Sequence, residues 1–268
     1  MHADGAIREF WARAPVTDLA DLHERLERVR WAHEPDDAGW AHGVPLTFLQ
    51  DAVEHWRLDF DWRAHEARLN ALPQFTTEVD QAIHFLHVRS PEPDAVPLLL
   101  CHGRPGSVFG FLEIIGPLTD PRAHGGAASD AFHVVVPSMP GCGFSGPMYD
   151  GGWDAARIAR ALATLMERLG YHRYATHGGA VAPSVPTPRP LTLAHALADS
   201  PVGQLAWTLD GFAARGEDTD AIDVDAAVAE ACLYWLTRTA GSAARTYCED
   251  ARCRADVADL RVRFAARR

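Results

Sequence analysis

The chain has 268 residues, of which 47% are hydrophobic and 23% are charged, and these values are typical of a globular protein with one large domain or two small ones. Its formal net charge of −11 argues against a general nucleic-acid-binding protein, which needs a basic surface to neutralise phosphates. The apolar runs are shorter than a membrane-spanning helix, and the first residues lack the basic and apolar regions of a secretory signal. We therefore expect a cytoplasmic protein that binds neither nucleic acid nor a membrane.

Cysteine and histidine spacing gives no sign of a metal site. The five cysteines, at positions 101, 142, 232, 248 and 253, form neither a CxxC motif nor a zinc-binding pattern. The fourteen histidines are dispersed, and His84 and His87 would point to opposite faces of an expected strand. We expect no metal and no cofactor, and we interpret the thiols as reduced and mostly structural.

Residues 1–75 are predicted to form a helical supporting segment. The sequence LADLHERLERVRW spaces its apolar residues three or four apart, at positions 19, 22, 26 and 29, which predicts an amphipathic helix. Two further helices are expected within residues 45–72, the first with Pro45 in its opening turn.

Residues 76–182 are predicted to form part of an α/β core. The strand candidates are AIHFLHVRS, VPLLLC, AFHVVVP and YHRYATHGG. The continuous apolar run VPLLLC is typical of a strand buried on both faces, as in a parallel sheet. Glycine-rich and proline-rich loops follow two of these strands, where such sheets usually carry functional residues. A helix is expected over residues 154–170, with Asp154 as its N-cap and Gly170 as its C-terminal stop.

Residues 183–268 are predicted to comprise a proline-rich junction followed by helices. Prolines at positions 183, 186, 188 and 190 are incompatible with a helix interior and favour extended chain. Beyond them, the sequence predicts helices interrupted by an acidic turn at GEDTDAIDVD, and an arginine-rich tail.

These motifs, in this order, resemble the epoxide hydrolases of the microsomal-like type, which have the α/β-hydrolase fold and an additional N-terminal segment. HGRPGS resembles the family's HGWPGS loop, AFHVVVPSMPGCGFSGP its second signature, and PLTLAHALADSPVGQLAW and LYWLTRTAGSAARTY its lid. The resemblance covers most of residues 10–250. It implies an incomplete α/β-hydrolase fold with a mostly parallel sheet, flanking helices, an N-terminal helical segment and a helical lid remnant.

The resemblance also implies how an epoxide would be hydrolysed to a vicinal diol. In the family, an aspartate on the nucleophile elbow attacks an epoxide carbon, and a histidine paired with an acid activates the water that hydrolyses the resulting ester. Two lid tyrosines donate hydrogen bonds to the epoxide oxygen, and backbone N–H groups bind the oxyanion. By this resemblance, Tyr247 is one lid tyrosine and Arg104 supplies a backbone N–H to the oxyanion hole. The expected ligand is a small apolar epoxide-like molecule, as in xenobiotic or aromatic compound metabolism.

The remaining catalytic groups of the family have no counterpart in the sequence. Gly178 and Gly179 match the start of the elbow, but Ala180 stands where the family has its aspartate. The chain then continues at about Pro188 with lid sequence, and neither the acid nor a GGHF-like histidine motif occurs in residues 248–268. A deletion and a shift of reading frame are both consistent with this junction.

No other side chain is an evident replacement. His177 and His195 do not correspond to the family's base, and the alternative nucleophiles Ser184 and Cys142 have no evident partner base. Arg104 also replaces the family's tryptophan, which would change the polarity of the pocket wall.

Three interpretations therefore stay open. The first is an epoxide hydrolase family member that is catalytically impaired, and the second is a working epoxide hydrolase whose catalytic groups come from elsewhere. The third is a non-catalytic protein that binds an apolar ligand or interacts with a partner. Because a shortened sheet exposes its edges, self-association through them is a further expectation.

Overall fold

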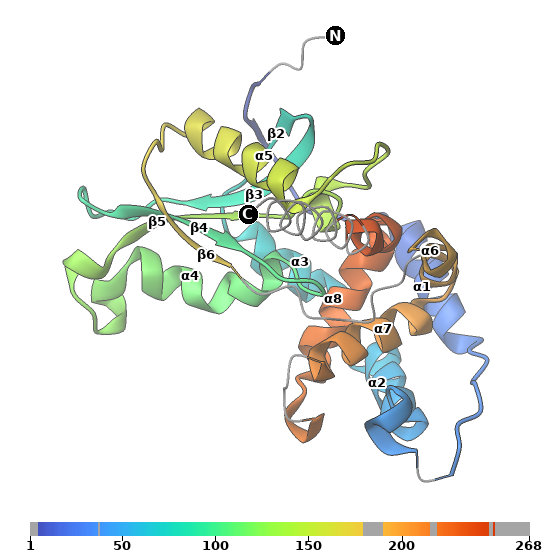
Figure 1. Cartoon of the computed structure of the whole chain (residues 1–268). Coiled ribbons are helices and arrows are strands. Elements are labelled where there is room, and N and C mark those ends of the chain that lie inside the picture. The colour runs from blue at the N-terminus through green and yellow to red at the C-terminus, as the bar shows by residue number, and fades with distance from the viewer. Residues whose placement is uncertain (1–4, 37, 179–189, 215–218, 247–248, 250–268) are drawn as a thin grey trace, which may run out of the picture.

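The computed structural model describes residues 5–36, 38–178, 190–214, 219–246 and 249. These residues form a sheet with helices on both faces and a cluster of helices beyond one end of the strands (Figure 1). The strands are β1 (Arg8–Glu9), β2 (Gln74–Val79), β3 (Gln81–Val88), β4 (Val96–Cys101), β5 (Phe132–Pro137) and β6 (Ala175–Gly178). The α-helices are α1 (Val16–Glu27), α2 (Leu46–Leu58), α3 (Trp62–Asn70), α4 (Leu112–Thr119), α5 (Ala155–Arg168), α6 (Pro190–Asp199), α7 (Pro201–Ala213) and α8 (Val224–Leu236). The predicted α/β class with flanking helices is confirmed.

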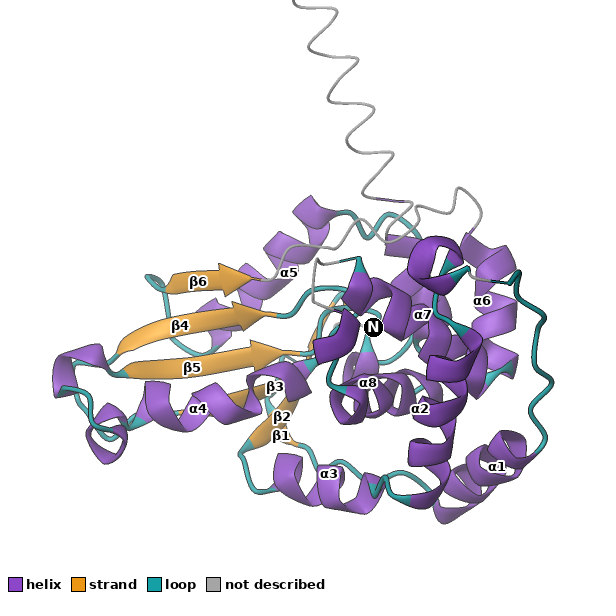
Figure 2. Ribbon diagram, turned by 90° about the horizontal axis from the view of Figure 1, so that it is seen from below, coloured by secondary structure: helices purple, strands orange, loops and turns teal. Residues whose placement is uncertain are grey.

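The parallel half of the sheet consists of β5, β4 and β6, in that spatial order. The chain passes from β4 through α4 to β5, and then from β5 through α5 to β6 on the other side of β4. Crossovers between parallel strands are right-handed, so two crossovers in opposite directions place their helices on opposite faces. Figure 1 shows α5 on one face and α4 on the other. The three strands end at one edge of the sheet, and their arrowheads in Figure 2 point toward the helical cluster.

The other half of the sheet is an antiparallel meander, and here the prediction of a mostly parallel sheet was wrong. β1, β2 and β3 pair successively in antiparallel fashion, and β3 pairs antiparallel with β5. The sheet is therefore mixed. The segment QFTTEV of β2 was not expected to be a strand, because its polar residues give no clear apolar alternation. Its pairing with β3 around a single turn residue, Asp80 with φ of 58°, is decided by the tertiary structure.

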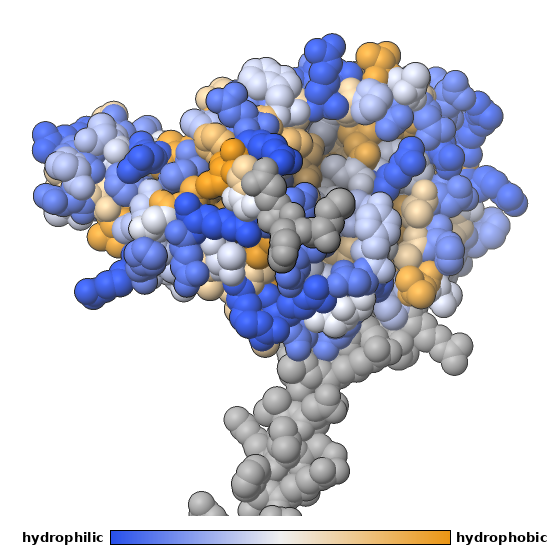
Figure 3. Space-filling view, turned by 90° about the horizontal axis from the view of Figure 1, so that it is seen from above, coloured by the Kyte–Doolittle hydropathy of each residue, from blue (hydrophilic) through white to orange (hydrophobic). Residues whose placement is uncertain are grey.

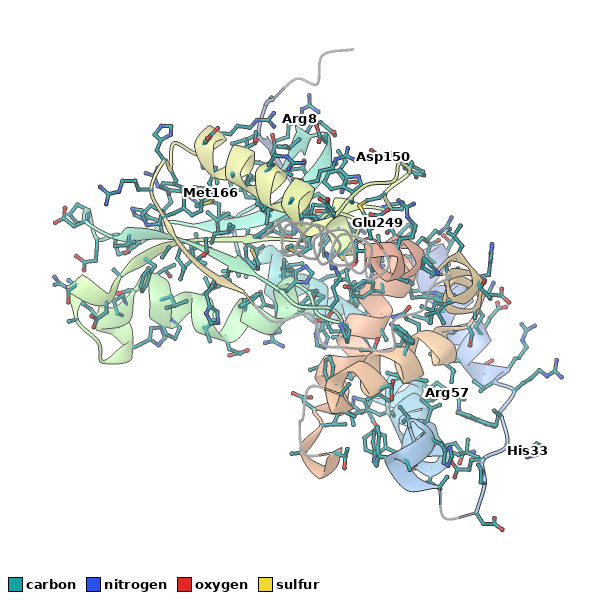
Figure 4. All side chains as sticks on the ribbon, viewed as in Figure 1. Arg8, His33, Arg57, Asp150, Met166 and Glu249 are labelled. Carbon is teal, nitrogen blue, oxygen red and sulfur yellow. The ribbon has the colours of Figure 1, made fainter. Side chains whose placement is uncertain are left out.

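Helix α5 covers one face of the sheet. Its apolar side chains, among them Ile158, Leu165 and Met166, pack in one cluster with Phe85 of β3 and Val135 of β5. Figure 4 labels Met166 beneath α5, and its side chain is fully buried. Burying such a face is worth roughly 25 cal/mol for each Å² of apolar surface removed from water, so it contributes strongly to folding.

Helix α4 covers the opposite face. Its Ile115 packs in a second cluster with Leu98 and Leu100, whereas Leu99 belongs to the cluster under α5. Successive residues of β4 therefore face opposite layers, and all three leucines are buried. The expectation that VPLLLC is buried on both faces is confirmed.

Helix α5 begins and ends next to the residues that the sequence predicted as its N-cap and C-terminal stop. The Asp154 carboxylate accepts the N–H of Arg157 at 2.7 Å, which satisfies one backbone donor in the first turn. After the helix, Gly170 has a φ of 84°, and its N–H donates to the carbonyl oxygen of Glu167 at 2.9 Å. The predicted N-cap and C-terminal stop are both confirmed.

The N-terminal segment joins the sheet to the helical cluster. Strand β1 pairs with β2, so the predicted range 1–75 contains a strand and the start of β2 as well as α1, α2 and α3. The Asn70 side chain bonds the backbone N–H and carbonyl of Ala12 at 2.9 and 2.8 Å. The buried Glu66 carboxylate accepts the N–H of Ala14 at 2.5 Å and the indole N–H of Trp62 at 2.8 Å. These bonds hold residues 12–14 against α3.

The helical cluster combines elements from both ends of the chain. Helices α1 and α2 share an apolar cluster with α7 and α8, whose buried members include Leu22, Val53, Leu209 and Leu233. The helices expected near residues 16–29 and 45–72 and after the junction are confirmed, and Pro190 begins α6. The junction at 183–189 and the arginine-rich tail lie outside the described residues, and the three predicted ranges 1–75, 76–182 and 183–268 stay predictions.

On the face seen in Figure 3, hydrophobic residues form several separate patches among hydrophilic ones. Within the described parts of the chain, no helix combines the length and apolar character that crossing a bilayer requires.

Candidate functional site

The HGRPGS loop (residues 102–107) leaves the carboxyl end of β4, and His102 fixes its start. The Nδ1–H of His102 donates to the carbonyl oxygen of Gly103 at 2.8 Å, so Nε2 accepts the N–H of Met139 at 3.0 Å. Burial lowers the pKa of His102 to about 4, although the bond to Gly103 favours the charged form. The neutral ring therefore joins the HGRPGS loop to the loop that follows β5.

A buried polar network connects that second loop (residues 138–146) to β2 and β3. Ser145 Oγ donates to the carbonyl oxygen of Ser138 at 2.6 Å and accepts the N–H of His84 at 3.0 Å. The His84 ring bridges Ser138 Oγ at 2.9 Å and Gln74 Oε1 at 3.1 Å. Because Gln74 Oε1 can only accept, Nε2 of His84 carries the proton. Burial lowers the pKa of His84 to about 3, so it is neutral at pH 7.

The lid, defined as residues 190–214 and 219–246, contacts the second loop through the residues after α8. The Gly143 N–H donates to Thr239 Oγ1 at 3.0 Å, and Ser242 Oγ donates to the carbonyl oxygen of Gly141 at 2.5 Å. Gly143 has a φ of 50°, and a Cβ there would lie 3.1 Å from Leu233 Cδ2. A glycine is therefore required where this loop meets α8.

The lid also contacts the HGRPGS loop. Tyr234 of α8 donates its hydroxyl to the carbonyl oxygen of Gly106 at 2.9 Å, and Ser107 Oγ donates to Glu230 Oε1 at 2.9 Å. Gly211 of α7 lies so close that a Cβ there would be 2.5 Å from Pro105 Cδ. Both glycine-rich loops are thus clamped between the sheet and the lid.

Arg104, predicted to supply an oxyanion-hole N–H, is 4% exposed within this clamp, and its peptide bond to Pro105 is cis. Its side chain lies near Cys142 of the second loop. Burial raises the pKa of the Cys142 thiol, the Arg104 and Tyr234 side chains oppose that rise, and the negative charge of Glu230 adds to it. The guanidinium is therefore placed among polar side chains of the core and lid. The proposed role of its N–H stays a prediction.

Gly178, the first residue of the predicted elbow, lies beside the end of β4. In the parallel pairing of β4 with β6, Cys101 lies opposite Gly178, so the chain leaves both strands at neighbouring positions. The fold therefore brings Gly178 beside Cys101, the residue before the HGRPGS loop. Gly179, Ala180 and Ser184 lie outside the described residues, as does Tyr247, so their predicted roles stay predictions.

The alternative groups named from the sequence are poorly suited to catalysis. Cys142 is 1% exposed and burial raises its pKa, which disfavours the reactive thiolate. His177 on β6 and His195 on α6 are both exposed. No hydrogen bond to either imidazole is found among the described residues that would orient it as a base.

A narrow cavity lies between the HGRPGS loop and the lid, with room for about one water molecule. Its lining is largely apolar: Arg104, Pro105, Leu197, Gln204, Trp207, Tyr234, Ala240, Ala243 and Ala244. A larger groove of about 830 Å³ lies between the loop after α1 and the start of α7. Neither glycine-rich loop lines that groove, and His33, one of its lining residues, lies far from the sheet in Figure 4. The narrow cavity therefore belongs to the candidate site.

Three polar residues of the site were not predicted from the sequence: Ser107, Glu230 and Tyr234. Glu230 had a signal, because it is a carboxylate within the apolar helical run AAVAEACLYW. A charged residue there must be buried with polar neighbours or face solvent, and only the tertiary structure shows which.

Comparison with known proteins gives consistent similarities. The family described as "Epoxide hydrolase N terminus" matches residues 7–111, and the family "alpha/beta hydrolase fold" matches residues 96–179. A Stigmatella aurantiaca protein assigned as an epoxide hydrolase is 40% identical over 306 residues, with 91% of this chain and 70% of that protein covered. Since 91% of this chain is about 244 residues, about 60 positions of that alignment have no counterpart here.

"Epoxide hydrolase 1" of Oryctolagus cuniculus is 36% identical over 181 residues, which cover 66% of this chain. The match spans only 40% of the rabbit protein's length. Among solved structures, an Aspergillus niger epoxide hydrolase has a TM-score of 0.77 at 28% identity, covering 92% of this chain and 79% of that one. The juvenile hormone epoxide hydrolase of Bombyx mori has a TM-score of 0.80 at 27% identity, with 92% and 76% covered.

Proposed function

Because this chain belongs to the epoxide hydrolases of the α/β-hydrolase fold, we propose that it derives from an enzyme that opened epoxides to vicinal diols and is itself catalytically impaired. The observation that carries this proposal is the identity of residue 180. Strand β6 ends at Gly178, and two positions later the sequence has Ala180 where the family has its aspartate. A methyl group cannot attack an epoxide carbon. About 60 positions of the alignment with the Stigmatella relative have no counterpart in this chain. This difference is consistent with a segment missing beyond Ala180.

The parts of the family's machinery that this chain retains would bind a ligand without turning it over. The backbone N–H of Arg104 is the candidate oxyanion donor, and Tyr247 is the candidate donor to an epoxide oxygen. Donors of this kind stabilise negative charge only when a nucleophile generates it. Without the aspartate and the base, they would contribute binding alone.

A second candidate function, a non-catalytic apolar-ligand-binding protein, is favoured by the cavity under the lid. Gln204, which lines it, is 3% exposed. Its Nε2 donates to Thr208 Oγ1 at 3.2 Å, and Thr208 Oγ1 donates to the backbone carbonyl oxygen of Gln204 at 2.9 Å. Gln204 Oε1 has no hydrogen-bond partner among the described residues. The cavity as described has room for one water molecule, which could satisfy this oxygen. An apolar ligand carrying an O–H group would replace that water and requires the lid to move outward.

Turnover of styrene oxide distinguishes a catalytically impaired protein from an active epoxide hydrolase. Purified protein is incubated with styrene oxide, and the diol is quantified by chromatography against buffer alone. We expect no diol above the uncatalysed level. Measurable turnover that Tyr247→Phe abolishes would refute the proposal.

The Ala180→Asp variant tests whether a side chain at position 180 can still react with an epoxide. Because no histidine of this sequence matches the family's base, we expect a trapped ester with the added mass of styrene oxide rather than turnover.

The hypothesis of a non-catalytic ligand-binding protein is tested with 1-phenyl-1,2-ethanediol, the product of that reaction. A ligand at a hundred times its dissociation constant stabilises the folded state by about 2.7 kcal/mol, which gives a measurable rise in melting temperature. We expect this rise in the unmodified chain and a smaller one in Gln204→Leu. An unchanged melting temperature at saturating diol would exclude the binding function.

Self-association is a separate proposal supported by β6. All four of its residues are exposed, and it is the last described strand at its edge of the sheet. Exposed strand edges pair with other strands, so light scattering should give a mass above that of one chain at high concentration. A monomer mass at every concentration would contradict it.

A further inference from the structure

We infer that Glu230 on α8 is a positioning residue that holds Arg104, and with it the HGRPGS loop, in place under the lid. This inference does not depend on whether the protein retains any catalytic activity.

Both charged side chains lie in the same buried region. Arg104 and Glu230 are each 4% exposed. Ser107, three residues after Arg104, donates to Glu230, and Arg104 lines the same narrow cavity as Tyr234, one turn after Glu230 on α8. Transfer of either charge from water into the protein interior is strongly unfavourable unless an opposite charge and hydrogen bonds compensate. Two opposite charges buried in one region can compensate each other in this way.

Hydrogen bonds make α8 the element that fixes the loop. Glu230 and Tyr234 are four residues apart, so they lie on one face of α8. From that face, Glu230 accepts the hydroxyl of Ser107 at 2.9 Å, and Tyr234 donates to the carbonyl of Gly106 at 2.9 Å. Consecutive residues of the HGRPGS loop are therefore attached to consecutive turns of one helix.

The geometry gives Glu230 a role that a neutral residue cannot fill. A glutamine there could still accept the hydrogen bond from Ser107, but it would leave the Arg104 guanidinium buried without its counter-charge. The loop would then gain stability by opening and hydrating the guanidinium. The backbone N–H of Arg104 would move with it. The carboxylate charge, rather than its volume, keeps this amide at the candidate site.

Cys142 offers a local measure of loop opening. Its thiol lies beside Arg104 and is 1% exposed, so an alkylating reagent reaches it only when the surrounding loops open. Iodoacetamide labelling is followed by peptide mass spectrometry, with the buried Cys232 of α8 as the internal reference. We expect Glu230→Gln to increase labelling of Cys142 roughly tenfold or more relative to Cys232.

A matched control separates positioning from general destabilisation. Glu66 is also a buried carboxylate, at 5% exposed, but it belongs to α3 and bonds Trp62 and Ala14. Glu66→Gln should lower the melting temperature without favouring labelling of Cys142. The inference is overturned if Glu230→Gln leaves the ratio of Cys142 to Cys232 labelling unchanged, or if Glu66→Gln raises it equally.

Rescue provides the second test. Arg104→Met should lower the urea midpoint because it removes a positive charge from the region of the Glu230 carboxylate. An isolated buried carboxylate has a raised folded-state pKa, so this loss should be small near pH 4.5 and grow as the pH rises toward 8. Combining Arg104→Met with Glu230→Gln removes the buried charge, and should restore part of the midpoint and abolish the added pH dependence. Additive losses in the double variant at every pH would refute the pairing.

Discussion

Acidification below pH 6.5 is expected to destabilise the folded chain through two buried histidines, His84 and His102. Both rings are neutral in the folded state because burial lowers the pKa of His84 to about 3 and that of His102 to about 4. In the unfolded chain, a histidine has a pKa of about 6.5. The unfolded state therefore binds more protons between these values, and stability falls as the pH falls through this window.

The magnitude follows from the width of the window. Each histidine that is protonated only when unfolded contributes a slope of about 1.4 kcal/mol for each pH unit. Because the unfolded rings are only half protonated at pH 6.5, each ring accounts for about 1.5 kcal/mol between pH 6.5 and pH 5, and the two together for about 3 kcal/mol. This loss is a large fraction of the roughly 5–15 kcal/mol that stabilises a typical domain. His87 also has its pKa lowered by burial, to about 4, but its partial exposure makes its contribution smaller.

Urea unfolding monitored by tryptophan fluorescence at several pH values measures this slope. The free energy of unfolding should be nearly constant from pH 7.5 to 8.5, where the rings are neutral in both states, and should then decrease steadily below pH 6.5. His84→Gln should be less stable at pH 7.5, because it loses bonds to Ser138 and Gln74, but its acid slope should be shallower by about one proton. A slope in His84→Gln equal to that of the unmodified chain would refute the assignment.

Four further substitutions test packing and capping by urea unfolding at pH 7.5. Gly211→Ala places a Cβ 2.5 Å from Pro105 Cδ and should destabilise by about 1–3 kcal/mol despite the better helix propensity of alanine. Gly116→Ala is its control, because the nearest atom is a His124 ring nitrogen 3.2 Å away at the surface, and it should be neutral or stabilising by up to about 1 kcal/mol. Asp154→Ala removes the N-cap of α5 and should destabilise by about 1 kcal/mol; no change would show that the cap is dispensable. Leu165→Ala, at a fully buried position of α5, should destabilise by about 2–5 kcal/mol, and a loss below 1 kcal/mol would indicate poor packing there.

Elements with strong local signals could be predicted from the sequence. Helix α5 combines a regular apolar face with Asp154 at its start and Gly170 at its end, and it forms between those residues. The run VPLLLC is short, apolar and followed by a glycine-proline loop, and it forms the expected strand. Motif resemblance added the family, which composition and periodicity alone do not contain.

Strand β2 and the charges of the site could not be predicted in the same way. QFTTEV has no strong periodicity, and it is a strand because β3 supplies its hydrogen-bond partners. From the sequence, Arg104 was expected only to alter the polarity of the pocket wall. The sequence does not show which groups surround its guanidinium. Glu230 lies 126 positions away in the sequence, and only folding brings its charge beside the same thiol.

The sequence by itself therefore determined the local elements, the family and the alanine at the expected nucleophile position. These properties depend on residues within one or two helical turns or on motifs that are contiguous. The tertiary structure decided the mixed sheet, the clamping of both glycine-rich loops by the lid, and the burial of Arg104 with Glu230. Those features depend on contacts between distant segments, and the free energy of a buried charge is set by what folding places around it.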